Sequence, residues 1–309
     1  MRKIFFALVC GVILLLPLLI FSNGGKIVEE FRIIDAQSQE VVLEKIPERI
    51  VVMSYGIATI MNELGIDLVG MTSTKRSLPD ALKIIPKLGN PKRPDIERIV
   101  KLKPDLIIFG PTFYERHKET FERYKIPVIS LSNVTYSDTK ELIINLGKAF
   151  KKEKKAIEIL YEFIKSEKKI IERIIGKPSP KIMIMFGAGS NFVLMRENTF
   201  VGSVAKVLKA VNVTEEIVGK ENLSSRIPFN IETIVRLNPD VILLVAHGDP
   251  EQVRKNFEKE FKENPVWKNI NAIKNNNYYF LDFKLFSANP GIRAIESLEY
   301  LADILYPQK

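Results

Sequence analysis

DIERIVKLKPDLIIFG, residues 95–110, returns 135 residues later as NIETIVRLNPDVILLV, residues 230–245. Each copy starts with apolar residues at helical spacing and ends in an apolar run after Pro-Asp, which indicates a helix followed by a buried strand. The residues of the first copy that recur are Ile96, Glu97, Ile99, Val100, Leu102, Pro104, Asp105 and Ile107. The period is too long for a solenoid, whose units have about 20 to 50 residues. The sequence therefore predicts two similar lobes.

The same order of elements continues on both sides of each copy. In the second half, further apolar runs lie at 181–186, 192–195, 240–245 and 278–282. In the first half, apolar runs at 49–53, 67–71, 105–110 and 127–131 are separated by helical patterns such as Ala58–Leu64 and Ile96–Leu102. Strands that alternate with helices indicate parallel sheets covered by helices. We therefore expect an α/β protein with two Rossmann-like lobes and mostly parallel sheets, at residues 26–150 and 177–309.

One long helical stretch, residues 151–176, lies between the lobes. Before it, Asp138 and Glu141 have the spacing of a capping box for a helix that ends near Gly147. The long helix itself is predicted from about Glu153 to Ile175, followed by a glycine stop signal. At about 1.5 Å per residue it would be about 34 Å long. We expect a rigid bridge that permits small hinge motions and leaves a ligand cleft between the lobes.

Residues 1–25 have the pattern of an export signal. Arg2 and Lys3 precede the apolar run Ile4–Phe21, and small residues follow it. A cleaved signal peptide and a retained N-terminal anchor both fit, because the run is also near the minimum length of a membrane span. Either alternative places the folded part outside the cytoplasm. The sole cysteine, Cys10, lies in this run, so the lobes can form neither a disulfide nor a thiolate metal site.

The chain has a formal net charge of +9, and much of the excess lies between Lys148 and Lys177. Basic residues there alternate with an apolar stripe at helical spacing, and we interpret them as the solvated face of a helix. No nucleic-acid recognition motif accompanies them, so we expect no nucleic-acid partner. The apolar stripe is formed by Ile157, Leu160, Tyr161, Ile164, Ile171 and Ile174.

Ligands of open parallel sheets bind beyond the carboxyl ends of the strands. His247, in the loop AHGDP, and Lys75, in the loop TSTK, both follow predicted strands. His247 is one of only two histidines, and it can either bind a ligand or form a hydrogen bond with the backbone. The other, His117, lies in a charged helical pattern and is expected to be solvated. Met53 ends a strand at a point where its side chain fits the core and the cleft equally well.

Glu97 and Glu232 stand at the same step of the repeat, each in the first turn of a predicted helix. A carboxylate there gains a few tenths to about 1 kcal/mol from the helix dipole. That gain explains each glutamate by itself. It does not explain why both lobes have a glutamate at the same step.

The sequence contains none of the common catalytic motifs. There is no GxSxG, no P-loop, no GxGxxG after a first strand and no HExxH. Two distant histidines, without a cysteine in either lobe, make a catalytic zinc site improbable. We therefore expect a protein that is not an enzyme and has no catalytic cofactor.

These features together resemble the substrate-binding proteins of ABC importers for iron, siderophores, haem and cobalamin. PERIVVMSYGIATIMNELGIDLVG, residues 47–70, is similar to that family's first strand and helix, and the two copies of the repeat are similar to its two lobe signatures. The resemblance covers nearly the whole chain after the export signal. It implies a permease and its ATPase as partners, and it implies that Glu97 and Glu232 meet arginines of the permease.

The second half is most similar to the IsdE-type haem receptors of Gram-positive bacteria. The similar segments include SPKIMIMFGAG at 179–189 and a longer stretch at 238–282. That group's axial histidine lies in an HGMP motif, which corresponds to His247 in HGDP. Its second axial ligand is a methionine in a G-x-P-M-x-P loop, which is GNPKRP here, with Lys92 in the methionine's place. The group's lipidated cysteine has no counterpart.

The resemblance implies haem as the transported ligand, with His247 bound to its iron. An ordinary lysine is charged at neutral pH, so we expect Lys92 either to pair with a propionate or to stay solvated. The iron would then be five-coordinate, bound by water, or bound by Met53. Tyr55, in the loop SYG after Met53, is a further candidate for ligand contact. The candidates for binding the propionates are Ser73, Lys75, Lys92 and Arg93.

Two alternatives remain open. The ligand could be another iron chelate, a ferric siderophore, or a corrinoid such as cobalamin, because both need a cleft with basic or aromatic residues. The chain could also be a sensor or adhesion module that uses the same fold without transport. If the chain is a transport receptor for any of these ligands, we expect it to be an extracytoplasmic monomer.

Overall fold

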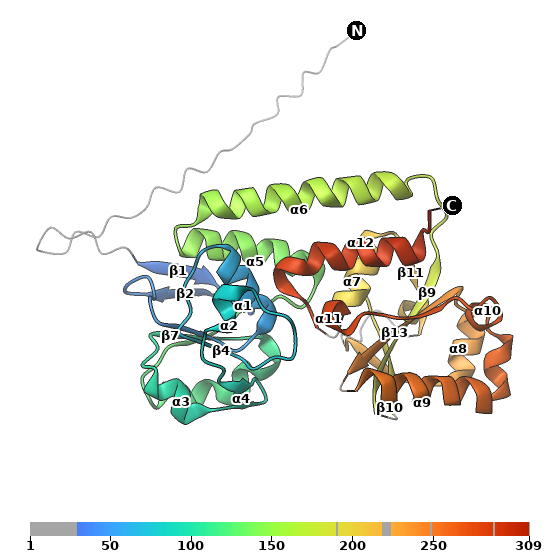
Figure 1. The fold of residues 1–309 in the computed structure, drawn as a ribbon, viewed down its shortest axis with the longest axis horizontal. Coiled ribbons are helices and arrows are strands. Elements are labelled where there is room, and N and C mark those ends of the chain that lie inside the picture. The colour runs from blue at the N-terminus through green and yellow to red at the C-terminus, as the bar shows by residue number, and fades with distance from the viewer. Residues whose placement is uncertain (1–29, 190, 218–223, 248, 287, 309) are drawn as a thin grey trace, which may run out of the picture.

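The computed structural model describes residues 30–189, 191–217, 224–247, 249–286 and 288–308. The signal peptide or anchor predicted at residues 1–25 lies outside them. Within these residues, no helix is long and apolar enough to cross a membrane. Figure 1 shows two lobes side by side, with the long helix α6 (Glu153–Ile174) running across both.

The first lobe is built on a four-stranded parallel sheet in the order β4-β3-β7-β8. Each of these strands lies within an apolar run that the sequence predicted. Two antiparallel hairpins, β1-β2 and β5-β6, are added to the lobe. The strands are β1 (Phe31–Ile34), β2 (Glu40–Leu43), β3 (Ile50–Val52), β4 (Gly70–Met71), β5 (Gly89–Asn90), β6 (Arg93–Pro94), β7 (Leu106–Phe109) and β8 (Val128–Ser130). The helices are α1 (Tyr55–Glu63), α2 (Asp80–Lys83), α3 (Ile96–Lys101), α4 (Pro111–Glu122) and α5 (Tyr136–Ala149).

The second lobe is built on a sheet in the order β12-β10-β9-β13-β14, with β11 paired to β9. The pairs of β9 with β11 and β13, and of β13 with β14, are parallel, whereas β10 and β12 form an antiparallel edge. The strands are β9 (Lys181–Ala188), β10 (Asn191–Met195), β11 (Val211–Asn212), β12 (Arg226–Pro228), β13 (Val241–His247) and β14 (Tyr278–Phe280). The helices are α7 (Phe200–Val207), η1 (Val213–Glu216), α8 (Ile231–Leu237), α9 (Pro250–Glu263), η2 (Pro265–Asn269), α10 (Asn271–Lys274), α11 (Phe283–Phe286), η3 (Gly291–Arg293) and α12 (Ala294–Leu305). The α/β fold with two lobes and a long connecting helix is confirmed.

One hydrophobic core passes from the first lobe into the second. It contains one face of each sheet and the inner sides of α5, α6, α7 and α12, and it includes Val52, Phe163, Ile184 and Leu298. The opposite face of each sheet has a core of its own. The lobes therefore share a layer of helices, which lies above both sheets in the view of Figure 1.

The repeated stretch forms the same structure twice, α3 followed by β7 and α8 followed by β13. Asp95 caps α3 by accepting a hydrogen bond from Arg98 N at 3.1 Å. Asn230 caps α8 by accepting one from Thr233 N at 3.0 Å. Both helices cover the sheet face that is turned away from the shared core. The repeat thus gives the two lobes the same outer surface.

The helix α5 begins two residues before the predicted cap. Thr135 is its N-cap and accepts a hydrogen bond from Asp138 N at 3.1 Å. The Asp138 carboxylate accepts a hydrogen bond from the Thr135 hydroxyl in return. The predicted capping box of Asp138 and Glu141 was wrong, because Asp138 is the third residue of the helix and Thr135 takes the cap position.

The apolar stripe of α6 does not all face the protein. The buried residues of the helix are Ala156, Ile159, Phe163, Ile170 and Ile174. Ile157, Tyr161 and Ile164, which the sequence placed in the same stripe, are exposed by 67, 63 and 59%. The helix therefore has a second apolar face that is turned to the outside.

The backbone of η3 touches α1 at the junction of the lobes. A Cβ atom on Gly291 would lie 2.2 Å from the Gly56 carbonyl oxygen and 2.2 Å from Thr59 Oγ1. Gly291 also has a φ of +66°, in the left-handed region that favours glycine. Thr59 Oγ1 donates a hydrogen bond to Gly56 O at 2.8 Å and accepts one from Ile292 N at 3.4 Å. No side chain larger than hydrogen fits at Gly291 without moving one lobe.

We expect Gly291→Ala to lower the free energy of unfolding by more than Gly65→Ala does. Gly65 has a similar φ of +70°, but an added Cβ there meets nothing within 4 Å, so its cost is backbone strain of about 1 kcal/mol. At Gly291 the overlap with Gly56 adds to that strain, for a total of about 3 kcal/mol. Urea unfolding of both variants measures the difference. Equal losses would show that the close approach to Gly56 does not stabilise the protein.

Candidate functional site

His247 is the last residue of β13, at the carboxyl end of a central strand of the second lobe. It is paired in register with Ala188 at the end of β9. Asp249 caps the following helix α9 by accepting hydrogen bonds from Glu251 N at 3.0 Å and Gln252 N at 3.3 Å. The sheet and the capped helix therefore hold the chain on both sides of the turn that follows His247.

The side chain of His247 is exposed, and its ring nitrogens have no hydrogen-bond partner among the described residues. It lies on the same sheet face as Phe186, because side chains alternate along a strand and Phe186 pairs with Val245. The ring centroids of Phe186 and His247 are 5.8 Å apart. The guanidinium of Arg226 lies 4.7 Å from the centroid of the Phe186 ring. We name His247, Phe186 and Arg226 the second-lobe site.

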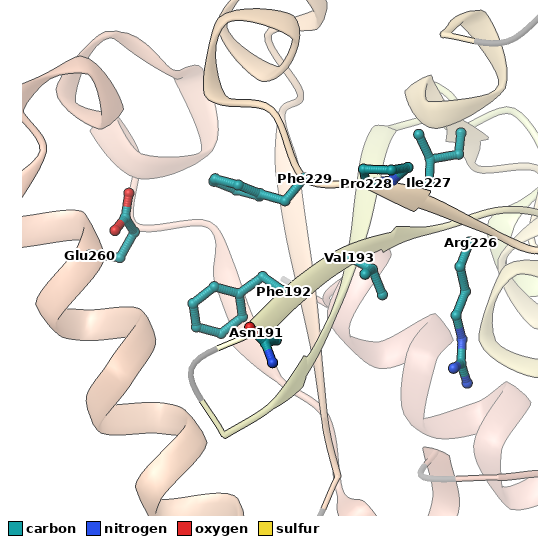
Figure 2. A pocket seen from close by; sticks show the side chains of 8 residues that line it. All are labelled: Asn191, Phe192, Val193, Arg226, Ile227, Pro228, Phe229 and Glu260. Atoms are coloured by element: carbon teal, nitrogen blue, oxygen red, sulfur yellow. The ribbon is translucent and has the colours of Figure 1, made fainter.

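A depression of about 670 Å³ lies along the antiparallel edge of the same sheet. Figure 2 shows Phe192, Phe229 and Glu260 at one end of it, with Arg226 extending away from them at the other. The lining contains neither His247 nor any residue of the first lobe. Arg226 is thus the residue through which the depression adjoins the second-lobe site. The lining residues are Asn191, Phe192, Val193, Arg226, Ile227, Pro228, Phe229 and Glu260.

Four predicted residues of the first lobe gather around the β5-β6 hairpin. Lys92 and Arg93 lie in its turn and its second strand. A hydrogen bond of 2.7 Å from Ser73 N to Gly89 O ties the loop that carries Ser73 and Lys75 to this hairpin. The three cationic side chains are exposed and form no ion pair within the described part of the chain. They are therefore available to anionic groups.

His117 is buried, and the prediction that it is solvated was wrong. Only 7% of the residue is exposed, because it shares a helix face with the buried residues Tyr114 and Phe121. Its ring stacks on Phe109 at a centroid distance of 5.2 Å, and its Nε2 lies 2.9 Å from Pro91 O. Burial lowers the pKa of His117, although the bond to Pro91 opposes the shift. The neutral ring donates from Nε2 and holds the turn that carries Lys92.

Met53 and Tyr55 are both covered by protein. Met53 is 1% exposed and belongs to a core that also contains Leu88 and Phe109. Of the two positions that the sequence left open for Met53, the structure favours the core. Tyr55 is 9% exposed, and its hydroxyl donates a hydrogen bond to Ser77 O at 3.1 Å.

Arg76, next to the predicted Lys75, is a cation that the sequence analysis missed. Its guanidinium carbon lies 4.7 Å from the centroid of the Tyr55 ring. Its Nη2 donates a hydrogen bond to Ala288 O of the second lobe at 3.3 Å. Burial lowers the pKa of Arg76, Tyr55 acts against this shift, and the nearby Arg293 adds to it. Because guanidinium groups remain charged in proteins, a positive charge lies where the two lobes meet.

Glu97 and Glu232 occupy the first turns of α3 and α8. Both are exposed, and neither forms an ion pair with any described residue. Among the described residues, no group of three or more His, Cys, Asp or Glu side chains is placed to hold a metal ion. The two glutamates therefore have no structural partner in the parts of the chain that are described.

The fold agrees with a comparison to known families. The model of the family described as "Periplasmic binding protein" matches residues 50–285. The chain belongs to the periplasmic binding protein family. It is a substrate-binding protein of the ABC-importer type, and its relatives are transport proteins rather than enzymes. The family also implies a location on the extracellular side of the membrane.

Three relatives show how far the similarity extends. "High-affinity heme uptake system protein IsdE" of Staphylococcus aureus is 28% identical over 263 residues, which cover 84% of this chain and 88% of that protein. The crystal structure of this IsdE complexed with heme has a TM-score of 0.75 at 27% identity and covers 84% of this chain and 98% of that chain. An ABC transporter substrate-binding protein from Listeria monocytogenes has a TM-score of 0.76 at 30% identity, covering 85% and 100%. Staphylococcus aureus SirA complexed with staphyloferrin B has a TM-score of 0.74 at 23% identity, covering 89% and 98%, and shares the fold.

Arg226, which the sequence analysis missed, could have been found from the repeat. Extended backwards by four residues from Asp95 and Asn230, the repeat aligns Pro91 with Arg226 and thereby Lys92 with Ile227. The segment before the repeated helix thus carries a cation in both lobes. Phe186 gave no comparable signal, because a phenylalanine that ends an apolar strand is expected in the core.

We expect the binding protein to lose stability below about pH 6.5 through His117. The folded state lowers the pKa of His117 below the ordinary value of about 6.5, so the folded state resists protonation. The stability gained from the neutral ring is complete above that value and is lost as the pH falls below it. His117→Gln keeps a donor for Pro91 O but does not titrate, so it should lose less stability between pH 7 and pH 5. Urea unfolding at both pH values tests this, and an equal loss in wild type and variant would contradict it.

Proposed function

We propose that this protein captures haem outside the cytoplasm and delivers it to an ABC permease. The observation that carries the proposal is His247, an exposed imidazole at a strand end with no partner among the described residues. A neutral imidazole is a good ligand of haem iron near pH 7. The similarity to IsdE, whose structure is known with heme, supports the proposal that the ligand is haem.

The surroundings of His247 suit a porphyrin. Phe186 offers an aromatic surface beside the imidazole, and its ring is inclined by 31° to that of His247. Arg226 is exposed, forms no ion pair with a described residue, and can bind a propionate by charge-assisted hydrogen bonds. Lys75, Lys92 and other cations of the first lobe can serve the second propionate. A ligand bound between the lobes would connect the second-lobe site with the cations of the first lobe. These two sets of residues share no contact within the described part of the chain.

The first lobe supplies no ready second ligand to the iron in this arrangement. Met53 is buried in the core, and Lys92 is exposed in the hairpin turn. We therefore propose a five-coordinate iron or one whose sixth ligand is water.

Delivery would use Glu97 and Glu232 as contacts for the permease. They are exposed, lie at equivalent places on the two lobes, and project from helices outside the shared core. A single rigid surface could therefore present both carboxylates at a fixed separation. ATP hydrolysis by the associated ATPase would then drive uptake.

A ferric siderophore is the second candidate for the ligand. The exposed cations Lys75, Lys92, Arg93 and Arg226 favour it, because ferric siderophore complexes carry carboxylate or catecholate oxygens. In that case His247 would not coordinate iron. Cobalamin is favoured by no particular observation beyond the family.

We expect hemin added to the purified protein to give a saturable Soret band. His247→Ala should weaken binding by about tenfold or more, or shift the band, because the iron loses its protein ligand. Absorption titration measures both effects. His117→Gln is the matched control, because it removes the only other histidine while it keeps the bond to Pro91 O.

Equal hemin binding by wild type and His247→Ala would show that His247 does not bind the haem iron. Binding of a ferric siderophore without binding of hemin would replace haem by the second candidate.

We expect Glu97→Ala with Glu232→Ala to abolish ATP-driven uptake and to leave ligand affinity within about twofold of wild type. The two carboxylates lie on helices that cover the sheet faces away from the shared core, and rim charges of this kind act on partner docking. Uptake into cells or vesicles with the permease and ATPase measures the effect. Glu153→Ala with Glu251→Ala, which changes two other first-turn glutamates, is the control. Normal uptake by the Glu97 and Glu232 variant would contradict a role in docking. The two carboxylates would then only interact favourably with the dipoles of their helices.

A further inference from the structure

The outer face of α6 carries apolar side chains at a regular spacing. Residues 157, 161, 164, 168 and 171 follow one another at alternating steps of four and three, which is the pattern of one helix face, and residue 175 follows at the C-cap, directly after the helix. Five of these positions are apolar, and the sixth is Lys168. Ile157, Tyr161, Ile164 and Ile175 are exposed by 67, 63, 59 and 65%. We name the six residues Ile157, Tyr161, Ile164, Lys168, Ile171 and Ile175 the outer stripe.

The outer stripe is larger than the scattered apolar exposure of an ordinary surface. The helix packs on the shared core through its other side, and Ile171 is partly buried against that core. The stability of the helix does not explain the exposed residues Ile157, Tyr161, Ile164 and Ile175. Figure 1 shows α6 along the outer edge of the molecule, with the two lobes beneath it. A contiguous exposed apolar patch of this kind marks an interaction surface.

A second copy of the chain is a poor occupant for the stripe. A parallel pair of α6 helices would place Lys168 against Lys168 in the middle of the contact. An antiparallel pair centred on the stripe would place Lys165 against Lys165 and Glu158 against Glu172 along one flank. Like charges in these positions oppose association in both orientations.

A lipid surface with anionic head groups fits the stripe better. Lys151, Lys152, Lys154 and Lys177 lie at its two ends, are exposed, and form no ion pair with a described residue. Lysine stems lie along an apolar surface while their ammonium groups reach phosphates. Lys168, which is unfavourable between two helices, can extend to the head groups in this way. Tyrosine, as at position 161, is preferred at the boundary between lipid and water.

A retained N-terminal anchor would bring α6 near a membrane. The ring of Phe31, at the start of the described chain, lies 4.9 Å from the ring of Phe150, three residues before α6 begins. Eight residues separate Glu30 from the apolar run Ile4–Phe21. If that run is held in a bilayer, a linker of this length reaches at most about 30 Å. The face of α6 would then lie within reach of the bilayer surface.

We propose that the outer stripe of α6 binds reversibly to an anionic lipid surface. Bound in this way, the protein has its shared helix layer against the membrane. The helices α3 and α8, which carry Glu97 and Glu232, cover the sheet faces that are turned away from that layer. Contact with a permease through those glutamates would require release from the lipid, so the binding must be weak. The proposal does not depend on which ligand the protein carries.

Sedimentation with vesicles tests the proposal. Every described strand and helix lies after residue 30, so a chain that starts at Lys26 keeps both lobes without the apolar run. We expect this chain to bind vesicles of equal parts phosphatidylglycerol and phosphatidylcholine at low salt, and to bind pure phosphatidylcholine much less. The triple variant Ile157→Ser, Tyr161→Ser, Ile164→Ser should lose at least about tenfold in the vesicle partition coefficient.

A second triple variant, Ile84→Ser, Tyr124→Ser, Val266→Ser, is the matched control, because it changes three exposed apolar side chains that lie outside α6 and the β1-β2 hairpin. It should bind vesicles like wild type. Absence of wild-type binding to the anionic vesicles, or an equal loss in the control, would overturn the proposal. A concentration-dependent dimer in light scattering that the α6 variant abolishes would also overturn it and assign the stripe to self-association.

Discussion

The hydrophobic core that the two lobes share is the constraint on which the remaining structure depends. It extends from the first sheet through α5 and α6 to α7, α12 and the second sheet. Polar contacts reinforce the same junction, such as the hydrogen bonds from Tyr136 N to Ser203 Oγ at 2.9 Å and from Asn289 Nδ2 to Thr139 Oγ1 at 2.9 Å. Wide separation of the lobes would expose this core at a cost of about 25 cal/mol for each Å² of apolar surface. The distance between the binding surfaces is therefore set before any ligand arrives.

This constraint divides the surface of each lobe into parts with different uses. One sheet face is committed to the shared core, and the other is covered by the helix of the repeat, α3 or α8, together with its neighbours. What remains is the carboxyl ends of the strands, where His247 lies, and the outer sides of the covering helices, where Glu97 and Glu232 lie. Ligand contact and partner contact are thus assigned to different side chains, although Lys92 and Arg93 lie directly before α3 and Arg226 lies shortly before α8. A substitution at one of these surfaces can leave the other intact.

The sequence predicted the features that depend on regular patterns. The repeat and the apolar runs indicated both sheets, and a glycine stop indicated the end of α6. The antiparallel edge β12 was missed, because it has only three residues and one of them is a proline. The second apolar face of α6 was not distinguished from the face that packs on the core, because helical spacing shows that residues share a face but not whether a partner covers it. Arg76 was missed for a similar reason, since its contact with Ala288 joins residues more than 200 positions apart.

The two histidines show why position in the fold outweighs residue type. His247 and His117 have the same side chain, and the sequence around His117 is the more polar of the two. Yet His117 is enclosed by Phe109 and the hairpin, where its one polar contact satisfies Pro91 O. His247 follows six buried residues of β13 and is exposed where the strand leaves the sheet. A buried neutral ring with a backbone partner can only hold structure, whereas an exposed ring without a partner has a lone pair to offer. The difference between the two comes from where the strand and the helix end, and this is why we propose the carboxyl end of β13, rather than the charged helix α4, as the place for the ligand.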